Sequence, residues 1–242
     1  MDHTLTETGL RMTYLRDTAT IEAMDQDRVL GELTEGMPGA EDFLSRRRFS
    51  DYDHVVLAAD HLTGRFVGML CARDGATALE DFVLLETAFV VPALRGKRVM
   101  KRMLALTILR IAGYRAAPTV LVAPTSSPIW YRSLFQMSNG FTGVFFPEPD
   151  AQAIPFHSAN LARRIAHEIG PNLRFEAATG TLRGGLASAA LRHGRQTSSD
   201  PDINAMFDET LAPADLMLAV IDFRAKTEAE ILHDARRMYR GR

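Results

Sequence analysis

The chain has 242 residues and 46% apolar side chains, enough for one large domain or for a core domain with a smaller lobe. Its formal net charge of −2 disfavours a general polyanion-binding surface and therefore a nucleic-acid partner. Cys71 is the only cysteine, which excludes an internal disulfide and a thiolate metal cluster. Since no run approaches the ~18 apolar residues of a membrane span, we expect a cytoplasmic protein with no membrane partner and no metal.

The first half of the chain predicts a layered α/β fold. Apolar spacing predicts a strand at residues 11–16, a helix at 18–33 and a weaker helix that ends at 46–48. Residues 54–59 and 65–72 flank a glycine turn and predict a hairpin. Residues 81–91 are mostly apolar and predict an interior strand. A helix at about 97–114, a strand at 118–124 and a helix capped by Ser127 with Pro128 at its first position follow. A final strand after that helix completes this part.

A second segment follows the break at Pro147, Glu148 and Pro149. We expect a helix at 160–169, a small hairpin from 173–177 and 181–182, a loop at 193–202, a strand at 216–223 and a helix at 227–239. The predicted division is a core at 1–147 and a C-terminal α/β extension at 148–242. The extension either covers the acceptor side of a cleft or forms a lobe of a homodimer.

Cations gather where the strand at 81–91 passes into the next helix. They are Arg95, Lys97, Arg98, Lys101 and Arg102. A helix start carries the positive end of the helix dipole and unpaired N–H groups, so side-chain cations there repel it unless an anion lies among them. A bound phosphate resolves this conflict. The alternative is a solvated basic helix end, which costs only ~0.3–1 kcal/mol for each cation.

The order of elements and this turn resemble the GNAT superfamily of acyl-CoA N-acyltransferases over roughly residues 11–147. In that family a strand ends in a hydrophobic pair, here Val90 and Val91, before a loop of form R/Q-x-x-G-x-G/A. Arg95 and Gly96 match this loop, whereas Arg98 and Met100 stand where the family has a glycine and a small residue. Arg98 either contacts a phosphate directly or obstructs the site.

The resemblance implies a central, mixed, mostly antiparallel sheet flanked by helices, and acetyl-CoA as co-substrate. The cofactor-binding residues that it implies are Phe89, Val90, Val91, Arg95, Gly96, Lys97, Arg98, Val99, Met100 and Lys101. In the family mechanism an amine attacks the thioester directly, and strand amides near Phe89 and Val90 stabilise the tetrahedral oxyanion.

Two residues are candidates for proton transfer. Glu86 interrupts an apolar strand, where an acid is costly unless it faces a cavity or a partner, and the resemblance implies a base at this spacing. The alternative is a structural acid paired with a neighbouring cation. Tyr131 is the available candidate for protonating the leaving thiolate, but it lies more than one turn before the family's usual position, and a core role is the stronger interpretation.

We therefore expect an N-acetyltransferase that acts on a primary amine of a small molecule or a peptide. One alternative is a transferase that uses a longer acyl chain on coenzyme A or on a carrier protein. The other is a non-catalytic relative that only binds a ligand or a partner.

Overall fold

The computed structural model describes residues 2–5, 9–16, 25–37, 44, 48–149, 156–185 and 197–241. Its contacts group the chain into two compact units. Unit 1 comprises Met1–Arg73, Leu85–Ala117 and Glu228–Arg242, and unit 2 comprises Asp74–Leu84 and Pro118–Thr227. The predicted fold class, a mixed and mostly antiparallel sheet flanked by helices, is confirmed.

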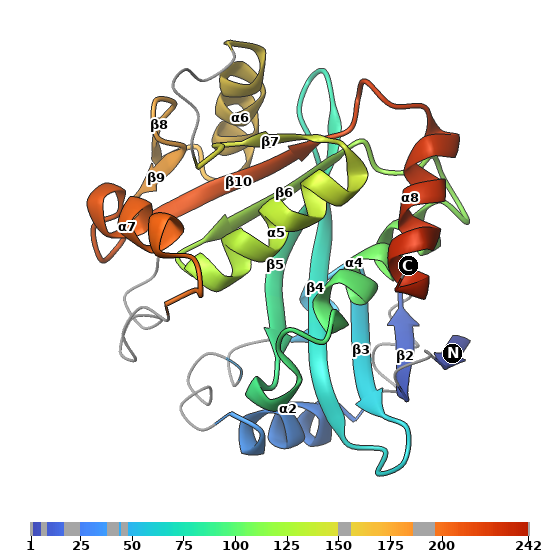
Figure 1. Cartoon of the computed structure of the whole chain (residues 1–242). Coiled ribbons are helices and arrows are strands. Elements are labelled where there is room, and N and C mark those ends of the chain that lie inside the picture. Colours follow the sequence, from blue (N-terminus) through green and yellow to red (C-terminus); the bar gives the residue numbers. More distant parts are fainter. Residues whose placement is uncertain are drawn as a thin grey trace. The chain divides into compact units, whose positions relative to one another are not determined.

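Unit 1 contains an antiparallel series of strands in sequence order (Figure 1). These are β1 (Asp2–Leu5), β2 (Leu10–Leu15), β3 (His54–Asp60), β4 (Phe66–Ala76) as far as Arg73, and the last residues of β5 (Asp81–Val90). Register pairs Met12 with Ala58 and Val56 with Leu70, so the predicted hairpin of β3 and β4 is confirmed.

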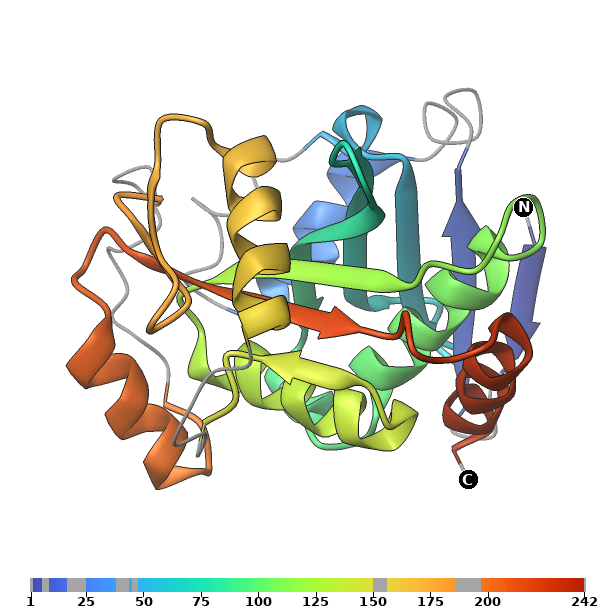
Figure 2. The same cartoon turned by 90° about the horizontal axis from the view of Figure 1, so that it is seen from above.

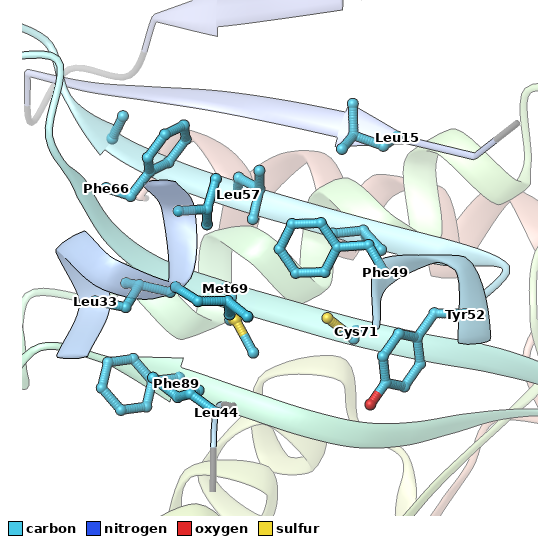
Figure 3. Close-up of a cluster of buried hydrophobic side chains, with 14 of the residues drawn as sticks. Leu15, Leu33, Leu44, Phe49, Tyr52, Leu57, Phe66, Met69, Cys71 and Phe89 are labelled. Atoms are coloured by element: carbon cyan, nitrogen blue, oxygen red, sulfur yellow. The ribbon is translucent and has the colours of Figure 1, made fainter. Parts of the chain in front are cut away.

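One face of the unit 1 strands packs against α2 (Gln26–Glu35) and the short helix η1 (Phe49–Asp51). Figure 3 shows this cluster, in which Leu33 and Phe49 meet Leu57, Met69 and Phe89. Burial of this apolar set at roughly 25 cal/mol per Å² is the main favourable term for the unit. Neighbouring residues of a strand point to opposite faces. Glu86 lies three residues before Phe89 on β5, and Phe89 points into the cluster, so Glu86 lies on the opposite face.

That opposite face is covered by α4 (Val99–Ile111), which contacts β2 and β3. A Cβ built on Gly68 would lie 3.3 Å from Met103 of α4 and 3.5 Å from Val90, which places Val90 on the α4 face. The last helix, α8 (Glu228–Arg240), packs beside α4 (Figure 1). The N-terminal end of α4 and the C-terminal end of α8 are both parts of unit 1.

Unit 2 contains the other end of β5 and the later strands. Val83 and Leu84 pair in parallel with β6 (Val120–Thr125), which pairs in antiparallel fashion with β10 (Leu216–Asp222). Beyond β10 follow β9 (Thr181–Arg183) and β8 (Arg174–Glu176), and β7 (Val144–Phe146) also pairs with β10.

Helices cover both faces of the unit 2 strands. Phe145 of β7 meets Tyr131 of α5 (Pro128–Phe141), whereas Phe146 belongs to the cluster of α6 (Phe156–Ile169). Since adjacent strand residues point to opposite faces, α5 and α6 lie on opposite sides of these strands. Figure 2 shows α6 crossing β10. Unit 2 also contains α7 (Pro201–Thr210).

Two elements differ from the sequence prediction. The predicted loop at 193–202 ends in α7, whose start at Pro201 is capped by Asp200, which accepts from the Ile203 amide at 3.3 Å. Strand β1 was not predicted, because it is short and has no apolar run. The strand predicted after the helix that begins at Pro128 is β7. The predicted weak helix that ends at residues 46–48, and the first part of the helix predicted at 18–33, fall mostly outside the described residues.

The compact units also divide the chain differently from the predicted boundary at residue 147. That boundary falls inside unit 2, and the last helix, α8, belongs to unit 1 with residues from the first half of the chain. The physical reason is that β10 pairs with β6, and α8 packs on α4. Residues 148–242 therefore complete both units instead of forming a unit of their own.

Candidate cofactor site

The end of β5 is held firmly in unit 1. The Val91 amide donates to the Val67 carbonyl at 2.9 Å, and the Phe89 and Val91 side chains are buried in the α2 cluster. A Cβ on Gly36, the C-cap residue of α2, would lie 2.5 Å from Cγ1 of Val91, so only glycine allows this close contact. The chain therefore leaves β5 from a fixed point.

The turn that follows contains two residues with left-handed backbone. After the short helix η2 (Pro92–Leu94), Gly96 has φ +78° and Arg98 has φ +60°. No atom lies within 4 Å of a Cβ built on Gly96, so glycine is needed there for its conformation and not for space. Arg98 occupies the position where the resembling family has glycine, and it adopts the conformation that glycine favours.

Helix α4 begins directly after this turn. Arg98 is its N-cap residue and makes no side-chain cap hydrogen bond, and the first helical bond runs from the Arg102 amide to the Arg98 carbonyl. The first amides of a helix have no acceptor within it, so this end offers N–H groups to an anion. The predicted cofactor residues Val99 and Met100 differ in exposure: the Val99 side chain is buried, and Met100 is half-buried. Their amides are the groups that a phosphate would meet.

The five cations at this helix start have different surroundings. Arg95 folds back over the turn, where Nε donates to the Val90 carbonyl at 3.3 Å and Nη2 lies 2.9 Å from Sδ of Met37. Partial desolvation lowers the pKa of the Arg95 guanidinium, which stays charged at neutral pH. Lys97 is exposed and Lys101 is half-buried.

The other two cations meet the C-terminal end of α8. Nη1 of Arg98 donates to the Gly241 carbonyl at 2.7 Å. Arg102 is only 4% exposed, and its Nη2 would lie 2.6 Å from a Cβ on Gly241. The C-terminal end of α8, with its partial negative charge, is therefore a favourable neighbour for these two cations.

Glu86 forms an ion pair with a cation on the adjacent strand. Nη2 of Arg73, on β4, lies against Oε1 of Glu86. The Glu86 side chain is 22% exposed and that of Arg73 is 49% exposed, so water reaches this pair. The next residue, Thr87, points to the opposite face, where the Tyr52 hydroxyl lies 3.2 Å from its Oγ1. The role of Glu86 as a base stays a prediction. In the alternative, Glu86 is a structural acid, and Arg73 is the cation that pairs with it.

Tyr131 lies in the core of unit 2. It is fully buried, its hydroxyl donates to the Pro147 carbonyl, and its ring packs edge-on against Phe145 and Phe207 with ring centroids 5.2 Å apart in both cases. This placement favours the core role over the role of a general acid, because the hydroxyl proton is already donated within the unit.

Within the described ranges, no group of three or more histidine, cysteine or acidic side chains could hold a metal ion. No described helix is long and apolar enough to cross a bilayer.

Comparison with known proteins gives partial structural likenesses. No family model matches the chain, and no curated protein matches it. Solved structures similar to this chain include GNAT-family acetyltransferases.

Three of these structures illustrate the extent of the likeness. An aminoglycoside acetyltransferase from an uncultured soil metagenomic sample, solved with sisomicin, is 13% identical over 62% of this chain and 95% of its own, with a TM-score of 0.39. A GNAT-family acetyltransferase from Staphylococcus aureus is 12% identical over 58% and 89%, with a TM-score of 0.38. A GNAT-family N-acetyltransferase from Escherichia coli, solved with CoA, is 15% identical over 52% and 69%, with a TM-score of 0.37.

Proposed function

We propose that this chain is an acyl-CoA-dependent N-acyltransferase that transfers the acetyl group of acetyl-CoA to a primary amine of a small molecule or a peptide. The observation that carries the proposal is the turn between β5 and α4. It combines two left-handed residues, an uncapped helix start and exposed cations directly after a buried strand. Such a turn aims backbone N–H groups and positive charge at one place, which suits a pyrophosphate.

The residues of the turn would contribute to binding in different ways, because their surroundings differ. Lys97 is exposed and supplies a mobile charge, whereas Arg95 is held by Val90 and Met37 and supplies a fixed one. The amides of Val99 and Met100 lie at the positive end of the α4 dipole. Together these groups would bind the phosphates of coenzyme A and leave its thioester end to lie along β5.

The chemistry then requires few protein groups. The amine nitrogen forms a bond to the thioester carbon, the C–S bond breaks, and the coenzyme A thiolate leaves with the electron pair. Strand amides near Phe89 and Val90 would stabilise the oxyanion of the tetrahedral intermediate. Glu86, half-buried on the α4 face of β5, would accept the proton that the acceptor's ammonium group must lose before its nitrogen can attack as a neutral amine.

Calorimetric titration with acetyl-CoA tests the binding step. We expect heat of binding and a raised melting temperature, both larger at low ionic strength because exposed charges are screened by salt. Lys97→Gln should weaken binding by about 3- to 10-fold, roughly 0.6–1.4 kcal/mol. Arg174→Gln is the matched control, because Arg174 is an 81% exposed arginine on β8 and should leave affinity unchanged. No heat and no thermal shift at millimolar acetyl-CoA would refute the proposal.

A further inference from the structure

Arg98 has a backbone conformation that an arginine does not adopt without help. Its φ of +60° and ψ of +16° are left-handed, a conformation that is unfavourable for a residue with a Cβ. Such strained residues persist when the surrounding structure holds them, and they cluster at functional sites. Arg98 therefore needs a restraint from the surrounding structure to keep this backbone conformation.

The C-terminal end of α8 supplies that restraint. Nη1 of Arg98 donates to the carbonyl of Gly241, which lies 143 residues further along the chain, at 2.7 Å. Gly241 directly follows α8, and its own amide donates back to the Met238 carbonyl at 3.1 Å. Its carbonyl thus lies at the negative end of the α8 dipole, where a cation binds favourably.

Gly241 is suited to this contact for two separate reasons. Its φ is +77°, which favours glycine, and a Cβ on it would lie 2.6 Å from Nη2 of the buried Arg102. A larger residue would therefore strain the backbone, and either the Arg102 side chain or the end of α8 would have to shift to make room for it.

The backbone at Arg98 determines where the amides at the start of α4 point, because Arg98 is the last residue before the helix. We propose that Arg98 is a positioning residue for the cofactor turn and that the Gly241 turn of α8 is a required part of the cofactor site. Arg98 acts through the Gly241 carbonyl, which holds the left-handed turn in the form that presents the α4 amides and Lys97. This role rests on the proposed function, since it concerns the same acetyl-CoA site.

Four variants test the positioning role by calorimetric titration with acetyl-CoA. Arg98→Ala and Gly241→Val should each weaken binding by about 5- to 10-fold, roughly 1–1.4 kcal/mol. The double variant should bind acetyl-CoA no more weakly than the weaker-binding single variant, because both changes remove the same contact. Arg98→Lys, which keeps a donor, should retain most of the affinity. Gly64→Val is the control, since Gly64 has φ +71° in the β3–β4 turn with no atom within 4 Å of its Cβ.

The Gly241→Val result decides the matter. If its affinity is unchanged while Arg98→Ala binds weakly, Arg98 contacts a phosphate directly and the positioning role is wrong. Tighter binding would show that Gly241 competes with the cofactor for Arg98, which also overturns the role. If the unaltered protein binds no acetyl-CoA, the proposed function fails and the positioning role fails with it. Binding by the unaltered protein therefore separates the two failures.

Discussion

Glu86 and Arg73 form an ion pair between adjacent strands, β5 and β4. The pair accounts for an acid in an otherwise apolar strand without any reference to catalysis. It also makes the catalytic hypothesis testable, because each partner can be changed separately.

Glu86→Gln should lower turnover by ~10²-fold or more if Glu86 accepts the proton of the attacking amine. The change keeps shape and hydrogen-bonding capacity but removes basicity, so acetyl-CoA affinity should stay within a factor of a few. Since both side chains are partly exposed, loss of the ion pair should change the free energy of unfolding by only about 0–1 kcal/mol. The measurement is release of the coenzyme A thiol with a panel of primary amines, alongside thermal unfolding.

Arg73→Gln is the matched control for that experiment. It removes the same ion pair but leaves the Glu86 carboxylate in place, so stability should change as in Glu86→Gln while turnover stays within a few-fold. Equal rate losses in both variants would indicate that the pair acts structurally. Unaltered turnover and an unaltered pH profile in Glu86→Gln would show that the base is another group or a water chain.

Gly96→Ala should weaken acetyl-CoA binding without creating a clash. At φ +78° an alanine is strained by roughly 1 kcal/mol or more, and no neighbouring atom lies within 4 Å of the new Cβ. The turn should relieve this strain by changing its conformation, which misplaces the α4 amides. Titration with acetyl-CoA and thermal unfolding measure the two effects separately.

Gly64→Ala provides the comparison, because Gly64 has nearly the same φ, +71°, and equally open surroundings in the turn between β3 and β4. Both variants should lose a similar amount of stability, and only Gly96→Ala should lose affinity. A similar loss of affinity in both would mean that general destabilisation, and not the shape of the cofactor turn, explains the result.

The turn between β5 and α4 shows what the sequence alone can predict and what it cannot. Gly96 beside Arg95 indicated a turn before a helix, and local signals of this kind depend only on neighbouring residues. The contact of Arg98 with Gly241 could not be predicted, because it joins residues 143 positions apart through the packing of α8 on α4. The partner of Glu86 was missed for the same reason: Arg73 is brought beside it by strand pairing.

Helix α7 is a different kind of miss, since its signals were present in the sequence. Asp200 followed by Pro201 is a good helix start, and Ile203 and Phe207 are spaced to face one side. The polar residues before Asp200 concealed this start. Ser127 and Pro128 give the same type of signal, and there the prediction is confirmed: Ser127 accepts from the Trp130 amide at 3.3 Å.

Tyr131→Phe should destabilise the protein and leave catalysis per folded molecule unchanged. The change removes the hydroxyl that donates to the Pro147 carbonyl in a fully buried position, and an unsatisfied buried acceptor costs about 1–3 kcal/mol. Thermal unfolding and turnover measured well below the melting temperature separate the two properties. A loss of turnover with no loss of stability would restore Tyr131 as the acid that protonates the leaving thiolate.

Asp215 should make the stability of the protein depend on pH in the acidic range. Its side chain is 5% exposed and lies 2.5 Å from Nη1 of Arg183, and the amides of Gly184 and Ala212 donate to it at 2.9 and 3.0 Å. Burial opposes the charged form, but the Gly184 amide, the Arg183 guanidinium and the Ala212 amide together outweigh it and lower the pKa of Asp215 below its usual value.

A lowered carboxyl pKa in the folded state stabilises the protein above the pKa of the unfolded chain, about 3.9, and the gain is lost as pH falls through the folded value. Asp215→Asn should therefore reduce the free energy of unfolding by roughly 1.5–3 kcal/mol at pH 7, the range for hydrogen bonds to charged groups. The difference between the two proteins should shrink steadily as pH drops below about 4. Urea unfolding at a series of pH values measures it, with Asp202→Asn on the exposed first turn of α7 as the control. A difference that does not change with pH would show that the shape of the Asp215 side chain, and not its charge, is responsible for its contribution to stability.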